Sequence, residues 1–157
     1  NFCPRVDKSF YPNQNLHLSE ALAIKIASEL QELDYQGGVV LCGYGEPMLH
    51  PQIYKIISAF RGIHIEIVTN GDHLSVDIIM RLFDAGLSFL CISMYDGPEQ
   101  VDYFEQMLKA ADVPEDRYIL RDRWHSEEDS FVEAESYVES DHNYLSLEAK
   151  EIELIKL

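Results

Sequence analysis

Segments with helical spacing alternate with short apolar runs along the chain, and this alternation restricts the fold more than any other feature. Helical spacing of apolar residues covers 18–33, 53–60, 78–83 and 101–111, and apolar strands are predicted near 38–44, 64–69, 89–94 and 118–122. Such alternation is typical of parallel βα units. The sequence therefore predicts an α/β fold with four consecutive parallel strands and helices outside them.

Local signals mark where several of these elements begin and end. Ser19 suits the N-cap of the first helix, Gly86 closes the third helix, and Pro47 stands where it could open the helix after the first strand. That first strand, which begins at Val39, is continuously apolar, as expected when helices cover both faces of a sheet.

Polar residues or glycines stand at the carboxyl end of every predicted strand. In parallel α/β folds, ligands bind at that end. Gly43 and Gly45 permit positive φ and the close approach of a ligand, and Glu46 follows them directly. The alternative for Glu46 is a solvated loop residue. The polar strand ends are Glu46, Thr69-Asn70, Ser93 to Asp96, and Arg121 to Arg123.

Composition limits the classes of function. The length of 157 residues suits one domain with a real core. The net charge of −16 argues against binding to nucleic acid or to an anionic membrane, because phosphate contacts need Lys and Arg. No run reaches membrane length, no signal peptide is visible, and three cysteines favour a reducing, cytoplasmic compartment. We expect Cys42 and Cys91, inside apolar strands, to be core thiols.

Cys3 stands in the opening segment NFCPR, before any predicted helix or strand. GYGEP at 43–47, TNG at 69–71, ISMYDG at 92–97 and RDRW at 121–124 follow it in order. With these motifs in this order, the chain resembles the radical S-adenosylmethionine (radical SAM) family. The resemblance covers residues 1–124 and implies a partial (β/α) barrel that lacks its first strand and most of its cluster loop.

The family's cluster loop reads C-x3-C-x-φ-C, where φ is aromatic, and its cysteines bind three irons of a [4Fe-4S] cluster. The resemblance implies that Phe2 is φ and that Cys3 is the third cysteine, the metal ligand in this chain, with the second cysteine immediately before Asn1. We therefore expect a truncated core that cannot hold the cluster with one of three thiolates. Pro4-Arg5 is common in one branch of the family, and RDRW matches a strand end of the same branch, which often carries a C-terminal cysteine-rich (SPASM-like) domain.

The resemblance also implies how S-adenosylmethionine (SAM) is bound, through its amino and carboxylate groups on the open iron. Glu46 receives the amino group, and Gly43 and Gly45 let the backbone approach the methionine part. Thr69, Asn70 and Ser93 suit the ribose hydroxyls or the carboxylate, although all three also read as residues that form turns at strand ends.

Aromatic and basic residues complete the implied site. Phe2 could pack near the adenine, and Tyr95 could approach the cofactor or the substrate or be a core tyrosine. Arg121 could pair with the cofactor carboxylate or form a surface ion pair. We expect at most one of Arg121 and Arg123 to point into the barrel.

The implied activity is that of an oxidoreductase-type radical enzyme. One electron from the cluster, supplied by a reductant such as flavodoxin or ferredoxin, cleaves SAM to a 5′-deoxyadenosyl radical that abstracts hydrogen from substrate. The substrate, a small molecule or a peptide, cannot be read from the sequence. Two alternatives stay open: a non-catalytic α/β binding or scaffold domain, and a magnesium-dependent or cofactor-free barrel enzyme using Glu46 and Asp96.

The motif matches end at residue 124 and the resemblance is lost altogether at Val132, so residues 125–157 are interpreted separately. They predict an acidic linker followed by a tail with loosely helical spacing of Leu145, Ala149, Ile152 and Ile155. The tail could pack as a helix, or it could be a later part of the chain that is not contiguous with the core.

Overall fold

The computed structural model describes residues 16–43 and 45–124, and these form a four-stranded sheet with helices. The predicted α/β class is confirmed. None of the helices in these residues is long and apolar enough to cross a membrane. In chain order the elements are α1 (Glu20–Glu32), β1 (Gly38–Leu41), the 3-10 helix η2 (Pro47–Leu49), α2 (Ile53–Ala59), β2 (His64–Thr69), α3 (Val76–Ala85), β3 (Phe89–Met94), α4 (Glu99–Ala110), the 3-10 helix η3 (Glu115–Arg117) and β4 (Tyr118–Asp122).

The sheet has the strand order β1-β2-β3-β4, and every neighbouring pair is parallel. The four predicted parallel strands are therefore confirmed, although β1 ends at Leu41 rather than near residue 44. Within the described residues, β1 and β4 form the two edges.

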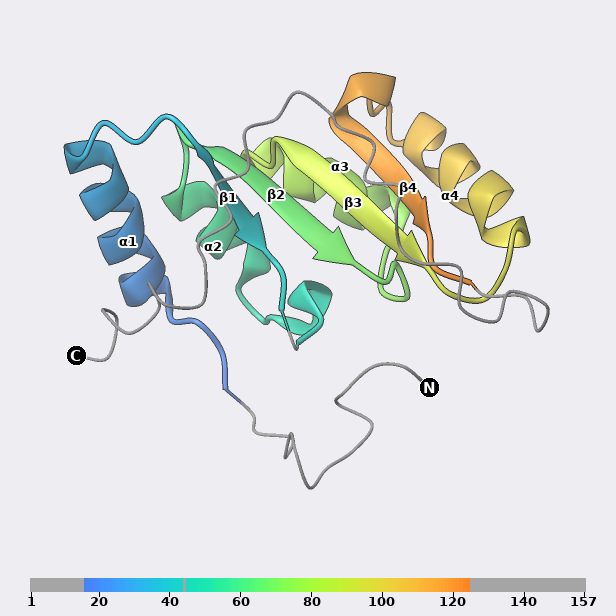
Figure 1. The fold of residues 1–157 in the computed structure, drawn as a ribbon, viewed down its shortest axis with the longest axis horizontal. Coiled ribbons are helices and arrows are strands. Elements are labelled where there is room, and N and C mark those ends of the chain that lie inside the picture. Colours follow the sequence, from blue (N-terminus) through green and yellow to red (C-terminus); the bar gives the residue numbers. More distant parts are fainter. Residues whose placement is uncertain (1–15, 44, 125–157) are drawn as a thin grey trace, which may run out of the picture.

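The helices line one face of this sheet as a row in which each packs on the next (Figure 1). Because the strands follow one another without reversal, right-handed crossovers place every helix on the same side. We call the opposite side the inner face. By strand alternation, it carries the side chains of Val40, Glu66, Val68, Phe89, Cys91, Ser93, Ile119 and Arg121.

The hydrophobic core lies between the sheet and the helices. Ile65 and Ile67 of β2 are fully buried and meet side chains of α2 and α3, such as Ile57 and Leu82. Each fully buried side chain of this size contributes about 1.5–3 kcal/mol relative to an exposed one. This layer fixes the sheet, and the sheet in turn fixes the positions of its strand ends.

The expectation that β1 is covered on both faces is wrong. Its residues alternate between exposed and half-buried, and Val40 is 37% exposed. No described helix covers the inner face, so an apolar run in this edge strand is buried on one side only. For the same reason Cys42, expected to be a core thiol, is exposed just after β1, whereas Cys91 is buried as expected.

The predicted helix ends are largely confirmed. The Ser19 hydroxyl accepts a hydrogen bond from the Leu22 amide at 3.2 Å, and Gly86 ends α3 in the left-handed conformation with φ of 114°. Pro47 opens only the short η2, because α2 begins later, at Ile53.

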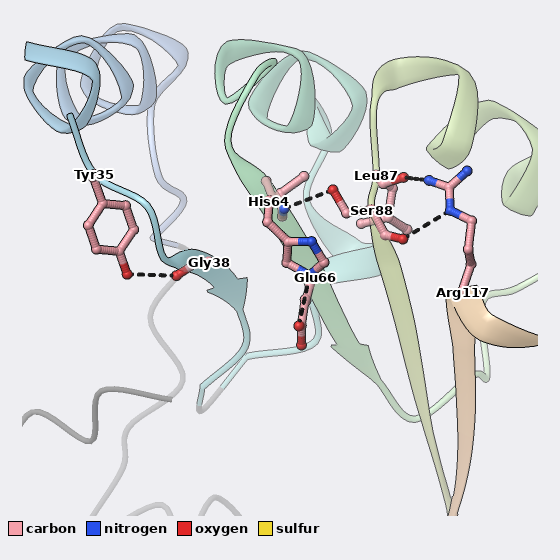
Figure 2. Close-up of polar contacts among 8 residues, drawn as sticks. Tyr35, Gly38, His64, Glu66, Leu87, Ser88 and Arg117 are labelled. Carbon is pink, nitrogen blue, oxygen red and sulfur yellow. Dashed lines mark hydrogen bonds and ion pairs between the residues drawn. The ribbon is translucent and has the colours of Figure 1, made fainter. Parts of the chain in front are cut away.

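Polar contacts hold the strand starts together at the amino edge of the sheet (Figure 2). The Ser88 hydroxyl accepts from the Ile65 amide at 3.1 Å, and the Arg117 guanidinium donates to the carbonyl oxygens of Leu87 and Ser88. Tyr35 donates to the Gly38 carbonyl at 3.1 Å. The polar groups at the amino edge therefore have structural partners, and the candidate site lies at the carboxyl edge.

Two glycines with positive φ give a matched test of the packing. Gly71 has a φ of 83° and Gly62 a φ of 96°. Replacing either glycine with alanine would therefore add backbone strain of about 1–2 kcal/mol. A Cβ at Gly71 would also overlap the ring of Phe104, whereas no described atom lies within 4 Å of a Cβ at Gly62. We expect Gly71→Ala to cost about 1–3 kcal/mol more than Gly62→Ala in the free energy of unfolding by urea. Equal losses would contradict this packing.

Candidate functional site

The carboxylate of Glu46 joins the ends of β1 and β2. Its Oε1 accepts from the Met48 amide at 3.0 Å and from the Thr69 hydroxyl at 2.6 Å. Its Oε2 accepts from the Asn70 amide at 3.1 Å. Glu46 is thus the N-cap of η2 and an acceptor for the last residue of β2 and the residue after it, so its position is set from two directions.

Thr69 positions Glu46 in this arrangement. The residue is 2% exposed, its hydroxyl donates to Glu46, and the same oxygen accepts from the Gly71 amide at 3.1 Å. Since a hydroxyl has a single proton to donate, Thr69 offers a ligand no further donor. The sequence grouped Thr69 with direct cofactor contacts, whereas the geometry brings it to Glu46.

The Asn70 side chain closes its own turn. Its Nδ2 donates to Asp72 Oδ2 at 2.7 Å, and its Oδ1 accepts from the Asp72 amide at 3.1 Å. This is the local hydrogen bonding that asparagine favours in turns. Asn70 therefore contributes its backbone amide to Glu46 and its side chain to the shape of the loop.

Gly43 leaves β1 with φ of 127°, in the region that favours glycine, and no described atom lies within 4 Å of a Cβ placed there. The predicted positive φ is confirmed at Gly43. Gly45 is exposed beside Glu46. The predicted cluster ligand Cys3 and the predicted aromatic contact Phe2 lie outside the described residues, as does the tail predicted over 125–157.

Ser93 lies on the inner face of β3, beside Arg121 of β4 in the register, and is 5% exposed. Its position in the register places it one residue past the row of Thr69 and Ile92. Ser93, Arg121 and the Glu46 network therefore occupy the same carboxyl edge of the sheet, as the sequence predicted.

The expectation that at most one of Arg121 and Arg123 reaches the inner face is wrong. Residues two apart on a strand point the same way, and the Arg123 amide extends the ladder by donating to the Met94 carbonyl at 2.8 Å. Both guanidinium groups act electrostatically on Cys91. Burial raises the pKa of the Cys91 thiol, Glu66 adds to this, and the two arginines and a hydrogen bond with Ser93 oppose it.

Tyr95 and Asp96, which follow β3, were the remaining candidates. Tyr95 is 44% exposed rather than a core residue. The Asp96 carboxylate accepts from Gln100 Nε2 at 3.1 Å, so Asp96 and Glu46 belong to separate local networks. The described residues contain no group of three or more side chains that could hold a metal ion.

A groove of about 520 Å³ lies beside β4 and α4. Its lining includes Tyr118, Glu105 and Trp124 but none of the predicted site residues. The groove is therefore distinct from the candidate site.

The sequence reasoning missed one inner-face residue with a charge. Glu66 is 7% exposed, and His64 contacts its carboxylate at 3.0 Å. The signal was a glutamate between Ile65 and Ile67 in a strand that is otherwise mostly apolar.

Comparison with known proteins gives a family and a fold. The model of the radical SAM superfamily matches residues 1–119. The crystal structure of BtrN in complex with AdoMet and 2-DOIA is 18% identical with a TM-score of 0.58, covering 74% of this chain and 49% of that chain. The crystal structure of SeMet BtrN in an OPEN conformation is 20% identical with a TM-score of 0.55, covering 77% and 51%. No curated protein sequence matches.

At these identities the two structures show a similar fold only. The chain spans about half the length of the solved chains. They agree with a partial (β/α) barrel of parallel strands.

The two described cysteines should differ in reactivity. In a Cys3→Ser background, we expect Cys42 to react quickly with an aromatic disulfide reagent at pH 8, because it is exposed. Cys91 should react more than about tenfold more slowly, because it is buried and its raised pKa leaves less thiolate at that pH. Cys42→Ser should remove the fast phase and Cys91→Ser the slow one. Equal rates in the folded protein would contradict the burial of Cys91.

Proposed function

The chain belongs to the radical SAM superfamily, and on this basis we propose that it is the core of an enzyme that binds SAM at the carboxyl edge of its sheet. The observation that carries the proposal is the fixed carboxylate of Glu46. Met48, Thr69 and Asn70 hold it at the edge where parallel α/β folds bind ligands.

Glu46 suits the amino group of SAM. A carboxylate offers about four lone-pair positions, and three described donors use one position on Oε2 and two on Oε1. An ammonium group can add a charge-assisted hydrogen bond at Oε2. The space beside Gly43 lets the methionine part of SAM approach the backbone.

The inner face offers partners for the rest of SAM. Ser93 supplies a hydroxyl, and Arg121, which is exposed, supplies a guanidinium that can pair bidentately with a carboxylate. Both lie near the carboxyl edge, on the side of the sheet without described helices. That one neighbour in fold was solved with AdoMet supports this assignment.

The [4Fe-4S] cluster would be held by Cys3 together with two thiolates of a C-x3-C segment placed before Asn1. Such a cluster would supply the electron for reductive cleavage of SAM to methionine and a 5′-deoxyadenosyl radical, which would take hydrogen from a substrate. The role of this chain's residues would be to bind and orient SAM. We further propose a one-electron reductant such as flavodoxin or ferredoxin as partner, a small molecule or peptide as substrate, and a cytoplasmic location.

Removing the charge of Glu46 should weaken SAM binding. We expect Glu46→Gln to raise the Kd for SAM by roughly tenfold to a hundredfold, since one hydrogen bond to a charged group is lost. Calorimetry on the 157-residue chain measures this without a cluster. Glu32→Gln, an exposed change on α1, removes the same charge and should leave the Kd unchanged. Equal effects of the two changes would point to a general charge effect and against the assignment.

Cys3 should be essential for the cluster. In a longer version with C-x3-C immediately before Asn1, we expect Cys3→Ala to abolish cluster binding and 5′-deoxyadenosine formation. Cys42→Ala and Cys91→Ala should keep the iron content, because neither residue belongs to the proposed ligand set. Iron content and 5′-deoxyadenosine are measured after anaerobic reconstitution. A full, active cluster in the Cys3 variant would favour the non-catalytic binding or scaffold domain instead.

A further inference from the structure

The short helix η2 has Glu46 at one end and His50 at the other. Glu46 is its N-cap and His50 is its C-cap. The Leu49 amide donates to the Glu46 carbonyl oxygen at 3.1 Å, which closes the turn. A single 3-10 turn is only weakly stable by itself, because few hydrogen bonds offset the ordering of its backbone. Contacts outside the turn must therefore fix its position.

The chain just before η2 restrains it only loosely. β1 ends at Leu41, Gly43 has a φ of 127°, and Gly45 is exposed. Glycine has more backbone freedom than any other residue, so this stretch does little to hold Glu46 relative to β1. The position of η2 then depends on the hydrogen bonds of the Glu46 carboxylate at one end and on the contacts of the other end.

His50 supplies the contacts at that other end through both of its ring nitrogens. Nε2 lies 2.8 Å from the carbonyl oxygen of Leu18, and Nδ1 accepts from the Gln52 amide at 3.0 Å. Since a carbonyl oxygen only accepts and an amide N–H only donates, the proton of the neutral ring is on Nε2. His50 is half-buried, and the ring of His17 packs edge-on against it with 5.1 Å between the ring centroids. The ring thus has a defined tautomer and orientation.

The hydrogen bond to Leu18 ties η2 to the start of α1. Leu18 immediately precedes Ser19, the N-cap of that helix, and it lies 32 residues from His50 in the sequence. The segment that precedes α1 in the sequence contains Cys3, the proposed cluster ligand. The same hydrogen bond therefore relates the turn that carries Glu46 to the helix that follows the Cys3 segment.

We propose that His50 is a positioning residue, which holds Glu46 where its carboxylate can receive the amino group of SAM. This rests on the proposed function, in which Glu46 binds that amino group. His50 itself does not contact SAM. It acts through η2, whose far end it fixes on the Leu18 carbonyl oxygen, while Thr69 and Asn70 fix the near end through Glu46.

Two substitutions separate the roles of the two ring nitrogens. A glutamine amide can donate to Leu18 from near the position of Nε2, whereas an asparagine oxygen can accept from Gln52 near the position of Nδ1 but cannot reach Leu18. We expect His50→Ala and His50→Asn to raise the Kd for SAM roughly threefold to tenfold, because the hydrogen bond to Leu18 is lost. His50→Gln should keep the Kd within about twofold of the original value. Calorimetry on the 157-residue chain measures these values.

Lys55→Gln is the matched control. It removes the ion pair of 3.1 Å between Lys55 of α2 and Glu20 of α1, so it loosens the same pair of helices without touching η2. We expect this change to leave the Kd for SAM unchanged. An increase as large as that of His50→Asn would mean that any loosening of α1 lowers affinity, and it would overturn the positioning role of His50.

NMR follows the position of Glu46 in the absence of SAM. The Asn70 amide donates to Glu46 Oε2, so its proton and nitrogen shifts report on that carboxylate. We expect the Asn70 resonance to move in His50→Asn, to return toward its original position in His50→Gln, and to stay there in Lys55→Gln. A long-range proton–nitrogen spectrum of the unsubstituted chain should show the His50 ring protonated on Nε2.

Equal Kd values for His50→Asn and His50→Gln, an Asn70 resonance that moves in neither His50→Ala nor His50→Asn, or a ring protonated on Nδ1 would each overturn the proposal. If the unsubstituted chain does not bind SAM, the proposed function fails by itself. The Asn70 resonance and the tautomer of His50 then still decide whether His50 positions Glu46, so the two failures are distinct.

Discussion

Four parallel strands in sequence order can be joined by right-handed crossovers only when every helix lies on one side of the sheet. This constraint divides the structure in two. The helix side takes the hydrophobic core, in which residues such as Ile57, Ile67 and Leu82 are fully buried. The other side is released from packing against helices, so it can carry Glu66, Ser93 and other polar groups.

Glu46 replaces backbone pairing at the point where β1 and β2 separate. Their register ends at Leu41 and Ile67, yet Thr69 and Asn70 remain tied to Glu46 through its carboxylate. A side-chain link of this kind lets the chain turn away at Gly43 while the two strand ends stay fixed. Hydrogen bonds to a charged group are worth about 1.5–3 kcal/mol each, so the same contacts that orient the acceptor also stabilise the edge.

Periodicity predicted which segments form helices and strands, because the core side of each element is apolar at the period of that element. Periodicity could not predict whether helices cover one face of a strand or both. An apolar run such as that of β1 looks the same whether one face or two are buried, so Cys42 was placed in the core although it is exposed. The sequence predicted that the site residues lie at strand ends. It did not predict that Thr69 contacts Glu46, because these two residues are 23 apart in sequence.

The charges of the inner face are ordered along the strands. Arg121 and Arg123 lie toward the carboxyl edge, Glu66 lies toward the amino edge, and Cys91 stands between them. The two arginines lower the pKa of the Cys91 thiol and Glu66 raises it, so this thiol lies between groups of opposite charge. A face with cationic groups at one end and a carboxylate at the other has an electrostatic potential that changes along the strands.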